Sequence, residues 1–270
     1  MTNPISSIVK VIKRMSSVSV AGGLSVSDSA IRYFRIEDER PVSVSLRLPS
    51  GIVEGGRIKN RTLAVAAFTE FRSMIPGDKS PEVVVTLGSG SVYSQFFTLP
   101  QLDPAGVKEA AELNLQMISP ISIDQAYFGY QFIGEANGGT GYEFLGGFVQ
   151  SSVVDEWLSV FKESDIIPVV IEFQSLSIVR AASLAGMGAD QAKLIVDVSS
   201  EGMSIMIARK GGLSFDYFYS WKNIQGEDRS IPFEKLKQII STEIGKVINF
   251  SLSRFGNEIK DIVVNTEGLS

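Results

Sequence analysis

The chain lacks cysteine and histidine altogether among its 270 residues. Disulfide bonds, zinc sites built from cysteine and histidine, and serine or cysteine nucleophiles activated by histidine are therefore excluded. Any catalysis would have to rely on carboxylates, lysines, hydroxyl groups or a metal ion held by carboxylates. The absence of cysteine also fits a reducing compartment.

An excess of positive charge and a long hydrophobic run are also missing. The 25 basic residues are outnumbered by 30 acidic ones, which gives a formal net charge of -5. Nucleic-acid-binding proteins normally carry a basic face, so no nucleic-acid partner is expected. No uninterrupted apolar stretch reaches the roughly 18 residues that span a bilayer, so no transmembrane helix is expected. With 44% hydrophobic residues, the chain can still bury one large core or two moderate ones.

Residues 1–17 form a short basic segment with an amphipathic pattern. Its apolar side chains recur at helical spacing, at Ile5, Ile8, Val9, Ile12 and Met15. Its cations Lys10, Lys13 and Arg14 lie within the apolar stretch, whereas a secretory signal has its charges first. A helix packed on the protein body, or a frayed terminus, is the favoured interpretation. Contact of residues 5–15 with a membrane surface or a partner groove is the alternative.

Short β-rich runs separated by turn residues occur in two similar groups. The first group is predicted to form three consecutive strands over 18–26, 30–37 and 42–48. After a glycine-rich stretch at 186–190, three strands recur over 193–198, 203–209 and 213–219. The order of elements repeats although the sequence does not. This layout is typical of the α/β fold of actin and the sugar kinases, with two duplicated, ribonuclease H-like lobes. Two unrelated α/β units are the alternative.

A further group of elements lies between the two copies and predicts a small inserted α+β subdomain. The predicted division is an N-terminal segment at 1–17, a first lobe at 18–91 and 151–188, an inserted subdomain at 92–150 and a second lobe at 189–270. The subdomain is rich in aromatic side chains, namely Phe96, Phe97, Tyr127, Phe128 and Tyr130. Alternation along the strands makes about half of these rings core. The others predict a partner groove without identifying its residues.

Several short motifs follow one another along most of the chain. They are residues 51–60 (GIVEGGRIKN), residues 83–89 followed by 97–100 (FTLP), residues 111–120 (AELNLQMISP), residues 164–172 (SDIIPVVIE) with Leu176 and Arg180, and residues 194–198 (LIVDV). Through these motifs the chain resembles PilM-like type IV pilus assembly proteins. That family has an actin-like fold and is related to FtsA and to the cytoplasmic domain of GspL.

The resemblance implies a cytoplasmic protein peripheral to the inner membrane. PilM-like proteins serve type IV pilus machines, and the cytoplasmic domain of GspL has the equivalent role in type II secretion. The expected partners are the tail of a PilN-like or GspL/GspM-like inner-membrane protein and the assembly motor ATPase, while self-association is left open. In the complete fold a further helix follows the last strand, so the second lobe is expected to be truncated.

The resemblance also locates a nucleotide cleft, whose first turn departs from the family pattern. Where PilM reads like G-I-D-I-G-S-S-S-I-K, this chain has GLSVSDSAIR from position 23. Ser25 stands in place of the aspartate and Ser27 in place of the turn glycine. Asp28 is expected to add negative charge where a phosphate would lie. Arg32 keeps the family's positive charge.

The other two turns of the cleft are altered as well. Asp197 retains the family's aspartate, but Ser199 replaces the glycine and Glu201 adds a carboxylate. The third turn of the cleft, after the last predicted strand, has one glycine, Gly268, where the family has two. The candidate residues of a degenerate nucleotide cleft are thus Ser25, Ser27, Ser29, Arg32, Asp197, Ser199, Ser200 and Gly268. We therefore expect a non-enzymatic scaffold with no catalytic residue, no metal site and no cofactor, its serines forming a satisfied polar turn. An ATP-binding, FtsA-like protein that uses Mg-ATP weakly or for regulation is the alternative.

Overall fold

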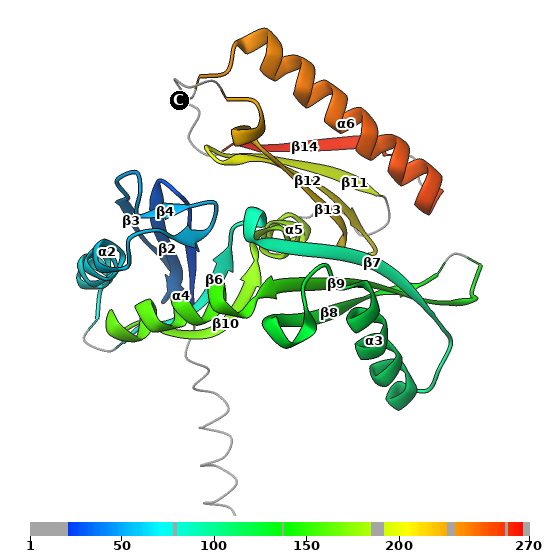
Figure 1. The fold of residues 1–270 in the computed structure, drawn as a ribbon, viewed down its shortest axis with the longest axis horizontal. Coiled ribbons are helices and arrows are strands. Elements are labelled where there is room, and N and C mark those ends of the chain that lie inside the picture. The colour runs from blue at the N-terminus through cyan, green and yellow to red at the C-terminus, as the bar shows by residue number, and fades with distance from the viewer. Residues whose placement is uncertain are drawn as a thin grey trace, which may run out of the picture.

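The computed structural model describes residues 21–77, 80–136, 138–184, 192–225, 230–256 and 259–266. Three larger β-sheets and five helices fill these ranges (Figure 1). The predicted N-terminal basic segment and Gly268 lie outside the described residues. Of the helices that the structure describes, none combines the length and the apolar character needed to cross a bilayer.

The first sheet has five strands in the order β10-β6-β1-β2-β3. Its strands are β1 (Gly22–Val26), β2 (Ala30–Glu37), β3 (Arg40–Arg47), β6 (Glu82–Leu87) and β10 (Ile167–Phe173). The first three form an antiparallel meander, and β6 runs parallel to both β1 and β10. Alternate side chains of β6 are buried, because successive side chains of a strand point to opposite faces of the sheet. The predicted strand meander is confirmed here.

Helices α2 (Arg61–Met74) and α4 (Ser151–Glu163) cover one face of this sheet. The first turn of α2 is capped by Asn60, whose side chain accepts a hydrogen bond from the Leu63 N–H at 3.1 Å. Phe68 of α2 packs against Trp157 and Phe161 of α4, with ring centroids 5.8 and 5.4 Å apart. All three rings are fully buried. This aromatic cluster anchors the first core. A two-stranded ribbon, β4 (Val53–Glu54) and β5 (Arg57–Ile58), precedes α2.

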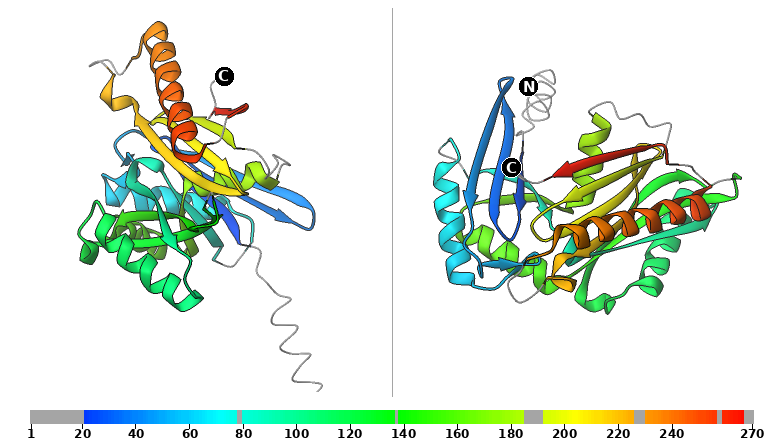
Figure 2. Two further views of the ribbon diagram at one scale, coloured as in Figure 1. Left: turned by 90° about the vertical axis from the view of Figure 1, so that its right-hand side faces the viewer. Right: turned by 90° about the horizontal axis from the view of Figure 1, so that it is seen from above.

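The second sheet repeats this topology. Its order is β13-β12-β11-β14, from strands β11 (Lys193–Val198), β12 (Gly202–Arg209), β13 (Gly212–Ser220) and β14 (Asp261–Thr266). The first three again form an antiparallel meander, and β14 runs parallel to β11 as β6 does to β1. Helix α6 (Phe233–Phe255) covers one face, and α5 (Gln174–Leu184) packs on the other (Figure 2). The predicted recurrence of the strand meander is therefore confirmed.

The third sheet is antiparallel, in the order β7-β9-β8. Its strands are β7 (Val92–Pro100), β8 (Ala126–Glu135) and β9 (Gly141–Gln150), with α3 (Pro104–Ile118) on one face. The single-turn 3-10 helices are η1 (Ser89–Ser91), η2 (Ile123–Gln125) and η3 (Trp221–Asn223). Asp103 caps α3 by accepting from the Gly106 N–H at 2.7 Å. The division into two lobes and an inserted subdomain stays a prediction. Each of the three larger sheets takes all its strands from one predicted part of that division.

Candidate functional site

Residues of the two lobes meet around a small polar cavity. It is lined by Ser25, Ser27, Ser89, Gln174, Asp197, Ser199, Glu201, Ser204 and Phe218. Four of the predicted cleft residues, Ser25, Ser27, Asp197 and Ser199, are thus brought together from the ends of β1 and β11 and the turns that follow them. The space available to the centre of a water molecule is about 10 Å³, which is room for about one water.

The remaining predicted cleft residues lie elsewhere. Ser29, Ser200 and Arg32 are not among the residues that line the cavity. Arg32 lies on β2, opposite Ser25 of β1. Gly268 is outside the described residues.

The Asp28 carboxylate binds a glycine turn of its own lobe. It accepts hydrogen bonds from the backbone N–H groups of Gly55 and Gly56, at 2.9 and 3.4 Å. The backbone N–H of Asp28 instead donates to Glu201 Oε1 at 2.6 Å. Glu201 of the second lobe therefore brings a second carboxylate to the first turn. Two carboxylates side by side would repel, whereas the glycine N–H groups satisfy Asp28.

Asp197 is held by side-chain amides from both directions. Gln174 Nε2 donates to Oδ2 at 3.2 Å, and Asn265 Nδ2 donates to Oδ1 at 2.6 Å. Gln174 begins α5, and Asn265 lies on β14 beside Asp197 in the register of the sheet. Sequence reasoning missed Gln174, because its only signal would have been a polar residue following a strand. Among the described residues, no group of three acidic side chains is arranged to hold a metal ion.

A chain of buried hydroxyl groups continues from this cavity. Ser204 donates to Ser89 at 3.1 Å, and the Ser89 and Ser175 hydroxyls are 3.2 Å apart. Ser175 donates to Asp216 Oδ1 at 2.8 Å. Burial raises the pKa of Asp216 to about 6, and the bond from Ser175 lowers it in part. This polar chain joins η1 and α5 to β12 and β13, so it links the two lobes in their interior.

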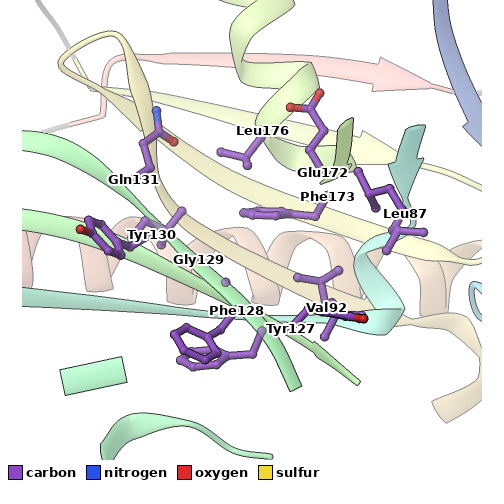
Figure 3. A pocket seen from close by; sticks show the side chains of 15 residues that line it. Leu87, Val92, Tyr127, Phe128, Gly129, Tyr130, Gln131, Glu172, Phe173 and Leu176 are labelled. Carbon is purple, nitrogen blue, oxygen red and sulfur yellow. The ribbon is translucent and has the colours of Figure 1, made fainter. Parts of the chain in front are cut away.

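An apolar groove of about 320 Å³ is the larger candidate site. Figure 3 shows residues of β8, among them Tyr127, Gly129 and Gln131, across from Phe173 and Leu176 at the β10–α5 junction. The other lining residues are Leu87, Val92, Phe128, Tyr130, Leu145, Gly147, Phe148, Val149, Ile171 and Glu172. Both β8 and β10 are edge strands of their sheets. The groove is therefore bordered by two edge strands, and an edge strand can pair with a further strand.

The aromatic residues singled out in the sequence divide between this groove and the interior. Tyr127, Phe128 and Tyr130 line the groove and are 50%, 39% and 37% exposed. Phe97 is buried against the stacked ring of Phe144, with centroids 5.3 Å apart. Phe96 packs against Phe255 of α6. Strand alternation predicted that about half of these rings would be buried, but it could not identify which rings.

The two sheets that repeat one topology, each a meander with a parallel strand beside its first strand, define the two-lobed actin-like fold. Comparisons of the sequence with family models and with curated proteins each returned no match. A chain of a solved PilM-PilN type IV pilus biogenesis complex is similar in structure, with a TM-score of 0.76, and the similarity covers 92% of this chain and 82% of that chain at 12% identity. The protein therefore resembles PilM in its fold.

Two other solved structures are similar at lower scores. One is the cytoplasmic domain of EpsL, an inner-membrane component of the type II secretion system of Vibrio cholerae, with a TM-score of 0.49 and 8% identity over 75% of this chain and 72% of that chain. The other is a protein of unknown function with an actin-like ATPase fold from Bacteroides thetaiotaomicron, with a TM-score of 0.47 and 13% identity over 93% of this chain and 92% of that chain.

Proposed function

We propose that this protein is a non-catalytic scaffold of a type IV pilus or type II secretion-like assembly platform. In this role it binds the cytoplasmic tail of a PilN-like membrane protein in the apolar groove between β8 and β10. The observation that carries the proposal is this groove, in a chain whose fold matches that of a solved PilM-PilN complex. A cytoplasmic position peripheral to the inner membrane and a link to the motor ATPase belong to the same proposal.

The chemistry of the groove favours an extended, apolar peptide. Among its described lining residues Glu172 is the one charged side chain, and it is engaged by Arg180 through two hydrogen bonds, one of 3.0 Å. An extended tail could pair its backbone with a strand edge and place alternate side chains among the aromatic rings. Aromatic side chains contribute large contact areas to such interfaces.

A leucine at Gly129 is expected to block the groove. A Cβ at Gly129 meets no atom within 4 Å, so the new side chain fits without displacing the protein and fills space that the tail requires. We expect the Gly129→Leu variant to bind the tail at least about tenfold more weakly, a change of about 1.4 kcal/mol. The measurement is fluorescence anisotropy with labelled synthetic peptides that carry the cytoplasmic tails of PilN-like proteins.

Gly245 supplies a matched control for that experiment. It lies on α6, away from the groove, and a Cβ there also meets no atom within 4 Å. The Gly245→Leu variant should bind the tail as the unmodified protein does. If every tail peptide failed to bind, or if the two leucine variants bound equally well, the groove would not be the tail site.

The non-catalytic part of the proposal concerns the cavity between the lobes. Room for about one water is far below the size of a nucleotide, and Glu201 places a carboxylate beside the first turn. We therefore expect no heat of binding in a calorimetric titration with Mg-ATP. Micromolar binding would instead favour a nucleotide-regulated, FtsA-like protein whose lobes open to admit ATP.

A further inference from the structure

Glu201 joins the two lobes through a short hydrogen bond. Its carboxylate lies on the turn between β11 and β12, and its Oε1 accepts the backbone N–H of Asp28, on the turn between β1 and β2, at 2.6 Å. A backbone N–H that donates to a carboxylate forms a charge-assisted bond, and such bonds are shorter than neutral ones. The second oxygen faces the first lobe as well, since a Cβ at Gly88 would lie 3.5 Å from Oε2. A residue of the second lobe thus reaches the backbone of two turns of the first.

The turn that carries Glu201 is fixed by bonds within its own lobe. The Glu201 N–H donates to Ser199 Oγ at 3.2 Å, and the Ser199 N–H donates to the Gly202 carbonyl at 2.9 Å. Trp221, which is 5% exposed, donates its backbone N–H to the Glu201 carbonyl at 3.1 Å and its ring N–H to the Ser199 carbonyl at 2.8 Å. The carboxylate is therefore presented by a pre-organised turn.

The turn that receives it is equally well held. The Ser27 N–H donates to the Ala30 carbonyl at 2.9 Å, and the Ala30 N–H donates to Ser27 Oγ at 3.2 Å. The side chain of Asp28 is drawn toward Gly55 and Gly56. The backbone N–H of Asp28 donates to the Glu201 carboxylate of the second lobe. Backbone N–H groups of tight turns are common positions for binding anions.

We propose that Glu201 is an internal ligand of the first-lobe turn, whose carboxylate holds an anion-binding position there and ties the lobes together without a bound phosphate. A phosphate from solution would have to displace a tethered carboxylate, because two anions side by side repel. Tethering gives the carboxylate a high effective concentration at the turn. The inference concerns the polar cavity alone and does not depend on tail binding in the groove.

Hydrogen exchange at single amides, followed by NMR, tests the bond directly. In the Glu201→Ala variant the Asp28 amide is expected to exchange at least about tenfold faster than in the unmodified protein, as befits the loss of a charge-assisted bond. The Glu201→Gln variant retains an oxygen acceptor and should show a smaller increase. The Ser27 amide, bonded within its own turn, should be unchanged in both.

Inorganic phosphate supplies the second arm of the test. With Glu201 removed, millimolar phosphate should shift the Asp28 amide resonance in a saturable way, and the unmodified protein should show no such shift. The matched control is Glu70→Gln, which removes the same charge from the exposed side of α2 in the first lobe and should alter neither exchange nor phosphate response.

Each contrary result overturns the assignment. An unchanged Asp28 amide in both Glu201 variants would mean that the bond does not exist in solution. Equal acceleration at Ser27 would mean that Glu201 merely supports the fold of the turn. A phosphate shift in the unmodified protein, or none in Glu201→Ala, would mean that the carboxylate does not hold the anion position.

Discussion

Replacing Glu143 by alanine is expected to lower the free energy of unfolding by about 3–5 kcal/mol, because it strands a buried charge. Glu143 on β9 accepts hydrogen bonds from Arg209 Nη2 at 2.8 Å and Lys210 Nζ at 2.7 Å. The side chains of Arg209 and Glu143 are only 3% and 6% exposed. The measurement is urea unfolding of the single variant beside the unmodified protein.

The size of this effect follows from the position of Arg209, which stays charged and buried when Glu143 is removed. Lys210 is partly exposed and can turn toward water, but Arg209 packs its guanidinium 3.7 Å from the centroid of the Phe255 ring. Burial already lowers the pKa of Arg209, and Glu143 acts in the opposite direction. An arginine does not lose its proton at neutral pH, so the unpaired charge stays in the interior.

Two comparisons separate this cause from a simple loss of contact. The double variant Glu143→Leu with Arg209→Met removes both charges and should recover most of the stability, since apolar replacements of a buried pair are often neutral or stabilising. Glu163→Ala breaks a pair with Arg61 whose side chains are 47% and 45% exposed, and little change is expected there. A Glu143→Ala variant as stable as Glu163→Ala would contradict the argument.

Replacing Asp216 by asparagine should remove a pH-dependent loss of stability. The folded pKa of Asp216 is raised from 3.8 to about 6 by burial. Between pH 3.8 and about pH 6 the folded state holds a proton that the unfolded state has released. The stability that this bound proton contributes is therefore fully present below pH 3.8 and is lost as the pH rises through about 6. A shift of about two pKa units corresponds to about 3 kcal/mol.

The measured quantity is the difference in free energy of unfolding between the unmodified protein and Asp216→Asn. That difference should move against the unmodified protein by about 3 kcal/mol from acidic to neutral pH, and then level off. Asp124→Asn, at an exposed 3-10 turn, controls for the loss of a carboxylate. A difference that stays constant over the same range would rule out a carboxyl group that titrates there in the folded state.

The local patterns of the sequence determined the elements and their order. Short β-rich runs bounded by turn residues predicted strands at 30–37 and 193–198, where the structure has β2 and β11. Such patterns depend on neighbouring residues and on the geometry of strands and helices, so they can be read without a fold. The repeated order of strands was enough to predict the actin-like layout.

Contacts between distant residues were decided only by the tertiary structure. Glu201 and Asp28 are 173 residues apart in the sequence. No local pattern predicts that the Glu201 carboxylate accepts the backbone N–H of Asp28. The direction of the Asp28 carboxylate depended on Gly55 and Gly56. The groove depended on two edge strands from different sheets coming to face each other. Periodicity determines which side of a helix or strand is apolar. Packing between elements determines which polar groups come into contact, and both candidate sites result from that packing.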